Sequence, residues 1–110
     1  MKIDSRNNIK MTRGDSETIT VSCKAIPFAQ DDQITFTVRK TAVSKDKLIE
    51  KVITEFEDGK ALIEIASEDT ADLKFGSYLY DIQLKRADGT ITTLIGPAAF
   101  GIGEEVSWNG

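Results

Sequence analysis

The stretch Gly76-Ser-Tyr-Leu-Tyr-Asp-Ile-Gln-Leu84 decides the predicted fold class of this chain. Successive side chains of an extended chain point to opposite faces. One face therefore carries four large apolar side chains: Tyr78, Tyr80, Ile82 and Leu84. The opposite face is polar apart from Leu79. This period of two is typical of a half-buried β-strand, and aromatic and β-branched residues fit its pleated surface. We expect a core strand against which the other segments pack.

Length and composition predict a single domain that folds without metal or disulfide staples. The chain has 110 residues, of which 40% are hydrophobic and 29% charged. A chain of this length can bury roughly 65% of the surface that it exposes when unfolded. Cys23 is the only cysteine, so an internal disulfide is excluded, which fits folding in a reducing compartment or a protein that never needed oxidation.

Charge and residue content exclude several classes of function. The net charge is −4 and there is no basic tract, so nothing favours binding to nucleic acid. The polar N-terminus does not resemble a signal peptide, and no apolar run approaches the ~20 residues of a membrane helix. The sequence predicts a chain kept in the cytosol unless lysis or a particle carries it out. The absence of histidine excludes His-dependent triads and His-ligated zinc.

The same alternation recurs along the chain and predicts about seven short strands. We expect a flexible N-terminus at 1–8, a β-sandwich domain at 9–103 and a C-terminal tail at 104–110. The expected strands cover 9–12, 17–24, 33–40, 48–56, 61–65, 76–84 and a last strand from 91 that resumes after Gly96-Pro97. Such spacing is typical of an antiparallel β-sandwich. Phe28, in the connection between the second and third strands, is expected to pack onto the core.

Three local features shape this prediction. Apolar residues of 48–56 also match a helical face, so helix remains the alternative there, although Asp58-Gly59 favours a hairpin with the next strand. Ser67 is expected to cap a single helical turn over 67–73. Gly96-Pro97 predicts an edge, a bulge or a switch of sheet, because proline cannot donate to a strand ladder.

Short motifs that could carry chemistry have simpler structural explanations. Arg13-Gly14-Asp15 is the tripeptide that integrin ligands display, but here it fits a turn before a strand. Helix-dipole complementarity accounts for the acidic residues near 67–73: Glu68, Asp69 and Asp72. Glu104-Glu105 fits the start of a solvated tail.

The cysteine and the aromatic residues are likewise interpreted as structural. Cys23 fits a small buried hydrophobe. Tyr78 and Tyr80 are expected in the core with backbone partners for their hydroxyls. Trp108 would cover the open end of the sandwich or contact a neighbouring subunit, and the sequence does not choose between these.

Two resemblances add to this interpretation. Gly76-Ser77-Tyr78 resembles the tyrosine corner of immunoglobulin-like domains, in which a tyrosine bonds back across the preceding connection. Lys74 stands where that corner usually has aspartate, and the partner cysteine and the tryptophan of antibody domains are absent. The resemblance implies an antiparallel immunoglobulin-like β-sandwich, and not an antibody-type domain.

The second resemblance covers nearly the whole chain in order. It rests on six stretches: Asn8 to Ser16, Phe36 to Lys40, Glu68 to Thr70, Tyr78 to Leu84, Ala87 to Thr90, and Phe100 to Val106. Together they resemble small structural proteins of tailed phages and prophages, of the baseplate-upper-protein N-terminal type. The resemblance implies a tail, baseplate or accessory virion component, assembled in the host bacterial cytoplasm and present in the virion.

The functional hypothesis follows from these observations. We expect a non-enzymatic protein that acts through contacts with other phage structural proteins or through self-assembly. No catalytic, cofactor or metal site, and no nucleic acid, membrane or small-molecule substrate, is predicted. The alternative is a carbohydrate-binding or cell-surface adhesion module, which would need an exposed row of aromatic side chains.

Overall fold

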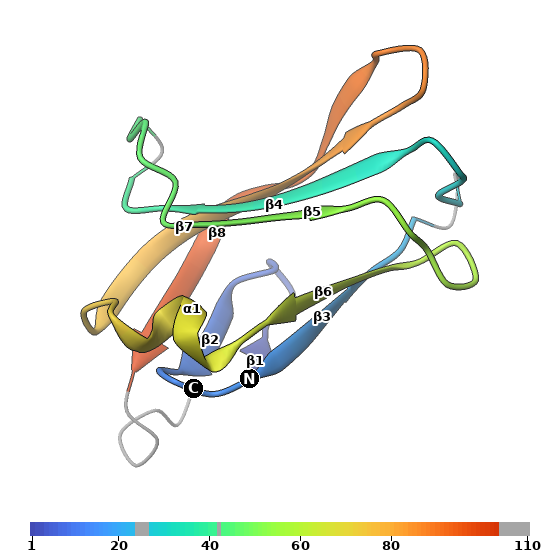
Figure 1. The fold of residues 1–110 in the computed structure, drawn as a ribbon. Helices are drawn as coiled ribbons and strands as arrows, with labels where there is room; N and C mark the ends of the chain where they lie inside the picture. The colour runs from blue at the N-terminus through green and yellow to red at the C-terminus, as the bar shows by residue number, and fades with distance from the viewer. Residues whose placement is uncertain (24–26, 42, 104–110) are drawn as a thin grey trace.

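The computed structural model describes residues 1–23, 27–41 and 43–103 and shows an all-β chain with two facing sheets (Figure 1). The larger sheet has the order β1-β2-β8-β7-β4-β5 and the smaller one pairs β3 with β6. In the described residues the elements are β1 (Lys2–Ile3), β2 (Ile9–Thr12), β3 (Glu17–Val21), β4 (Gln33–Arg39), β5 (Ile49–Ile53), β6 (Ala61–Ile65), α1 (Ser67–Ala71), β7 (Gly76–Lys85) and β8 (Ile91–Gly103).

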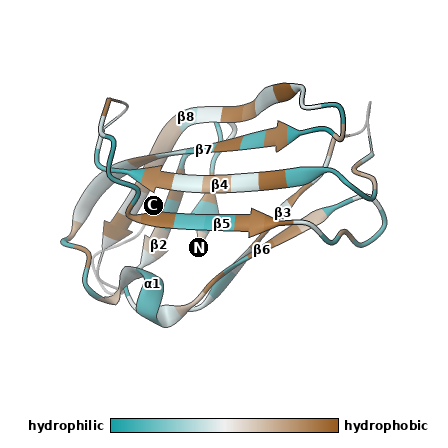
Figure 2. Cartoon of the chain, turned by 45° about the horizontal axis from the view of Figure 1, so that its top comes forward, coloured by the Kyte–Doolittle hydropathy of each residue, from teal (hydrophilic) through white to brown (hydrophobic). Residues whose placement is uncertain are grey.

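Strand β7 has neighbours on both sides and forms the core that the sequence predicts. It pairs antiparallel with β4 from Gln33–Lys85 to Arg39–Leu79, and with β8 along its other edge. Its inward side chains are 0–9% exposed: Tyr78, Tyr80, Ile82 and Leu84. Hydrophobic and hydrophilic residues alternate along the neighbouring strands (Figure 2). The predicted core strand and its buried face are confirmed.

An aromatic cluster fills the centre between the sheets. The ring centroids of Phe36 and Tyr80 are 5.5 Å apart, and Phe100 lies 6.0 Å from Phe36 and 6.3 Å from Tyr80 in edge-to-face contact. Aromatic pairs prefer edge-to-face or offset arrangements over a direct face-to-face sandwich. Phe28 is 5% exposed and belongs to the same core, as expected from the sequence.

The prediction of an antiparallel sandwich of about seven strands needs one correction, the direction of one pairing. Eight strands form in the described residues, because two residues near the N-terminus pair as β1. Strand β2 runs parallel to β8, from Ile9–Phe100 to Thr12–Gly103. This parallel pairing joins segments that are far apart in the sequence, so local alternation does not encode it.

Residues 1–8, predicted to be a flexible N-terminus, have a defined turn. The Asp4 carboxylate accepts the backbone N–H groups of Arg6 and Asn8 at 2.8 and 2.9 Å. The Asn8 side-chain oxygen then accepts the N–H of Ala99 at 2.9 Å, one step before the β2–β8 ladder begins. The turn thus extends the ladder through a side chain, while the flexibility of the segment stays a prediction.

The strand interpretation of 48–56 is confirmed for β5, and its helical alternative is wrong. The hairpin expected at Asp58-Gly59 is also wrong, since β5 pairs with β4 in one sheet and β6 with β3 in the other. The turn itself forms, with φ of 52° at Asp58 and 74° at Gly59, and a single bridge joins Glu57 and Lys60. Between β5 and β6 the chain crosses from the large sheet to the small one, because β5 buries its apolar side chains from the large sheet and β6 from the small sheet.

Two expected element boundaries shift. Strand β3 ends at Val21 rather than residue 24, and the partly buried Cys23 follows it and packs against the core. Ser67 does not cap α1, because the N-cap is Ala66. The Asp69 carboxylate reaches back and accepts the Ala66 N–H at 2.7 Å, so an acidic residue in the first turn replaces the expected serine cap.

The Gly96-Pro97 pair forms a bulge within β8, one of the three outcomes that the sequence predicts. Tyr80 pairs with Ala98 and Ile82 with Ile95, so two residues of β8 lie opposite Asp81. Gly96 has φ of +150°, and a Cβ atom there would lie 2.6 Å from the Asp81 Cβ. Only glycine therefore fits at this position.

We predict that Gly96→Ala destabilises the protein more than Gly76→Ala does. Gly76 has a similar φ of +145°, but a Cβ atom added there would meet no atom within 4 Å. Gly76→Ala should thus lower the free energy of unfolding by backbone strain alone, on the order of 1–2 kcal/mol. Gly96→Ala adds the clash with Asp81, and urea unfolding of both variants measures the difference. Equal losses would contradict this explanation of the bulge.

Candidate interaction surface

The two tyrosines of β7 are buried, and their hydroxyls donate to backbone carbonyls of two separate connections. The Tyr78 hydroxyl donates to the Lys74 carbonyl at 2.7 Å, four residues back across the preceding connection. The Tyr80 hydroxyl donates to the Asn7 carbonyl in the N-terminal turn. The predicted backbone partners are confirmed. Because both rings are buried, neither offers the exposed aromatic face that sugar stacking needs.

Burial also changes the acidity of Tyr80. Loss of hydration, together with the nearby negative charge of Asp4, raises the pKa of Tyr80 from 10.0 to about 12. Both causes disfavour the phenolate, which would also lose the ability to donate to Asn7. The neutral hydroxyl thus ties β7 to the N-terminal turn across the whole neutral pH range.

We predict an alkaline loss of stability that depends on Tyr80. Between pH 10 and about 12 the unfolded chain loses this proton while the folded chain keeps it, so the free energy of unfolding falls as pH rises. Tyr80→Phe should lower stability at neutral pH and flatten this decline. Denaturant unfolding at stepped pH measures it, with Tyr78→Phe as the control that keeps Tyr80. An unchanged slope in Tyr80→Phe would contradict the assignment.

The outward face of the large sheet carries an ordered set of polar side chains, which we call the outer face. It consists of Thr35, Thr37, Arg39, Glu50, Val52, Asp81, Gln83 and Lys85. Its rows follow the strand register, with Thr37 opposite both Glu50 and Asp81, and Thr35 opposite Val52 and Gln83. The outer face therefore crosses three neighbouring strands.

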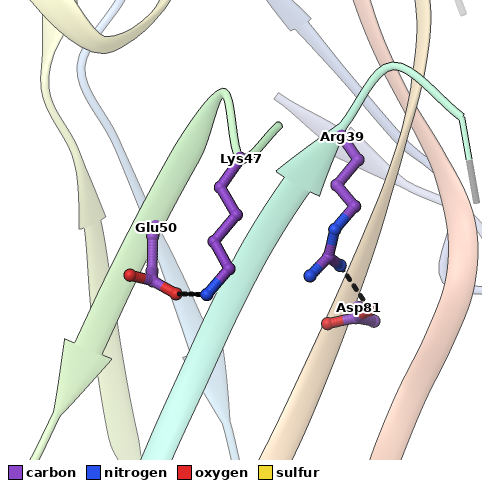
Figure 3. A network of polar contacts seen from close by, with 4 residues as sticks. All are labelled: Arg39, Lys47, Glu50 and Asp81. Atoms are coloured by element: carbon purple, nitrogen blue, oxygen red, sulfur yellow. Dashed lines mark hydrogen bonds and ion pairs between the residues drawn. The ribbon is translucent and has the colours of Figure 1, made fainter. Parts of the chain in front are cut away.

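Two ion pairs lie on the outer face (Figure 3), and the strand register places Thr37 between Glu50 of one pair and Asp81 of the other. Arg39 Nη1 is 3.2 Å from Asp81 Oδ2, and Lys47 Nζ is 2.8 Å from Glu50 Oε2. Thr37 beneath them is only 4% exposed. Surface pairs of this kind contribute about 0–1 kcal/mol each, so their effect is mainly to orient charged groups. Val52, at 47% exposed, adds an apolar patch to the same face.

Strand β5, one of the two edge strands of the large sheet, carries a charged side chain that points inward. Lys51 lies opposite Phe36 on the core side, and its Nζ is 2.8 Å from Asp69 Oδ2 on α1. Partial burial opposes ionisation of Asp69, but the bonds from Lys51 and the Ala66 N–H hold the pKa of this carboxyl below its usual value. Inward-pointing charges on edge strands discourage pairing with other chains. The outer face, rather than this edge, is the more accessible contact surface.

The Arg13-Gly14-Asp15 stretch forms the expected turn and packs against the chain. The Arg13 guanidinium donates to the Leu73 carbonyl at 3.2 Å and its Cζ lies 4.1 Å from the centre of the Phe75 ring. The Gly14 N–H donates to the hydroxyl of Thr70, which is fully buried, at 2.8 Å. The role of Thr70 is not predicted from the sequence, because no local pattern indicates that its hydroxyl meets a turn 56 residues away.

The other residues that the sequence analysis considers lie in separate places. Glu68, on α1, and Asp72, directly after it, are exposed, whereas Asp69 binds Lys51 and the Ala66 N–H. Among the described residues, no group of three or more Cys, Asp and Glu side chains is placed to hold a metal ion. Glu104, Glu105 and Trp108 lie outside the described residues.

Comparison with known proteins identifies no family for this chain. No protein-family model matches it, and no curated protein matches it at a significant level. Within the part of the chain that the structure describes, no helix is long and apolar enough to cross a membrane.

Proposed function

We propose that this protein is a non-enzymatic structural component of a tailed phage or prophage, in the tail, baseplate or another part of the virion. Six stretches that run in order along the chain carry the resemblance to such proteins. It acts through protein–protein contacts, with other phage structural proteins or with further copies of itself. It is assembled in the host cytoplasm and is present in the particle.

The finer description of the fold belongs to the same proposal. We infer an immunoglobulin-like sandwich, supported by the order β2-β8-β7-β4-β5 facing the β3–β6 pair. The bond from Tyr78 to the Lys74 carbonyl has the connectivity of a tyrosine corner. The departure from the usual aspartate at Lys74 does not affect this bond, because the acceptor is a main-chain oxygen.

The observation that carries the contact function is the outer face. The Arg39–Asp81 and Lys47–Glu50 pairs orient its charged groups in the free protein. Pre-oriented charges favour a specific register with a complementary surface and add little affinity of their own. Val52 supplies an exposed apolar contact beside them. A surface of this kind fits a flat protein partner in an assembly.

The alternative of a carbohydrate-binding module is less well supported. Such a module needs a row of exposed aromatic rings, and the two tyrosines that could form it are at most 9% exposed.

The proposal is tested by the gene neighbourhood and by particle composition. We expect the gene to lie among tail, portal or capsid genes, and the protein to be found by mass spectrometry in purified particles. A gene neighbourhood without tail, portal or capsid genes, together with particles that lack the protein, would contradict the proposal.

The outer face is tested in the same particles. The double variant Val52→Lys and Gln83→Lys changes exposed positions on this face, so it should fold and fail to enter particles. Glu64→Lys is the matched control, because Glu64 is exposed on the other sheet. Normal incorporation of the double variant would contradict the role of the outer face.

A further inference from the structure

The first residues of β7 have a strand partner on one side only. Residues 76–78 pair with β8, but the ladder with β4 ends at the pair of Leu79 and Arg39. After β4 the chain turns away toward β5, and the Ser44 N–H donates to the Thr41 carbonyl at 3.2 Å. Among the described residues, none pairs with residues 76–78 on the β4 side. An unpaired strand edge is a template for pairing with another chain.

The register identifies Ser77 as the residue whose backbone groups face this open side. In antiparallel pairs, successive residues direct their N–H and C=O groups to opposite neighbours. The Ala99 N–H donates to the Asn8 side chain on the β2 side of β8. The next residue, Phe100, therefore directs its groups to Tyr78 of β7. Ser77 then directs its N–H and its carbonyl away from β8, to the side where β4 has ended.

A hollow of about 390 Å³ lies at this open stretch of β7, and Ser77 belongs to its lining. Two of the side chains around it are large, apolar and only partly covered: Leu48 is 40% exposed and Phe75 45% exposed. An extended segment that paired with Ser77 would lie over the hollow and cover these side chains. The open backbone groups and the apolar walls therefore belong to one contact site.

The charges around the hollow favour an acidic segment. Lys40 and Lys74 line it, are exposed and make no ion pair with a described residue. The Arg13 guanidinium carbon lies 4.1 Å from the centre of the Phe75 ring and adds positive charge at one wall. Asp72 is the acidic residue of the lining, so the balance stays positive. Complementary charges of this kind select the partner and its register.

We propose that the open edge of β7 beside this hollow binds an extended, acidic segment of a partner protein by β-strand addition. One residue of the segment forms hydrogen bonds with both backbone groups of Ser77. An apolar side chain of the segment packs against Leu48 and Phe75, and acidic side chains pair with Lys40 and Lys74. This site shares no residue with the outer face, and it does not depend on the proposed phage function.

A peptide array tests the chemistry of the segment. The probes are short synthetic peptides in which glutamate alternates with each of the large apolar residues, and matched peptides in which lysine replaces glutamate. The labelled protein should bind the best glutamate peptide about tenfold more tightly than its lysine counterpart, because two ion pairs replace two repulsions. The variant Lys40→Glu with Lys74→Glu should reverse this preference. Binding to neither set, or equal binding to both, would overturn the proposal.

The backbone pairing is tested with the glutamate peptide that binds best. Ser77→Pro removes the N–H that faces the hollow and no bond to β8, and proline is tolerated at strand edges. This variant should fold, as circular dichroism verifies, and bind about tenfold more weakly, because the backbone bond is lost. Ser77→Ala keeps the N–H and is the matched control, which should bind as the wild-type protein does. Equal binding by Ser77→Pro and Ser77→Ala would contradict strand addition.

Hydrogen exchange of the Ser77 amide gives a readout that needs no variant. In the wild-type protein alone this amide should exchange quickly at every protein concentration, and the glutamate peptide should slow its exchange. An exchange rate that the bound peptide leaves unchanged would overturn the proposal. Slow exchange in the protein alone that becomes fast on dilution would assign the edge to a second copy and would also overturn it.

Discussion

The structure depends on the burial of two tyrosine rings along one strand without loss of their hydroxyl hydrogen bonds. Strand β7 lies between β4 and β8, so its inward side chains are buried in the middle of the large sheet's core face. A buried hydroxyl without a partner is unfavourable by about 1–3 kcal/mol. Tyr78 and Tyr80 avoid this loss by donating to the main-chain carbonyls of Lys74, before β7, and of Asn7, before β2.

The sequence predicts those parts of the fold that depend on local alternation. Apolar side chains at every second position set the inward face of β4, β6 and β7, because the period of a strand is independent of its partner. The backbone partners of the tyrosines could also be predicted, and so could an interruption of the last strand at Gly96-Pro97, although the sequence left open whether it would be an edge, a bulge or a switch of sheet. The all-β class and the core residues were therefore accessible from the sequence.

The rest depends on contacts between distant segments, for which a single sequence carries no signal. The turn at Asp58-Gly59 has hairpin chemistry, yet the layer in which each flanking strand buries its side chains decides the pairing. The Thr70 hydroxyl and the Lys51–Asp69 pair become meaningful only when α1 lies against the turn at Gly14 and the edge strand β5. The outer face is similar, because its ion pairs join residues of neighbouring strands whose register is set by the core beneath them.

The most direct test of this account is the free energy of unfolding of Tyr78→Ala, measured by urea denaturation at neutral pH. The substitution removes a ring that is 9% exposed and the bond to Lys74, so the account predicts a loss on the order of 3 kcal/mol or more. A variant as stable as the wild-type protein would contradict the account, because it would mean that the tyrosine face of β7 does not contribute to the buried core.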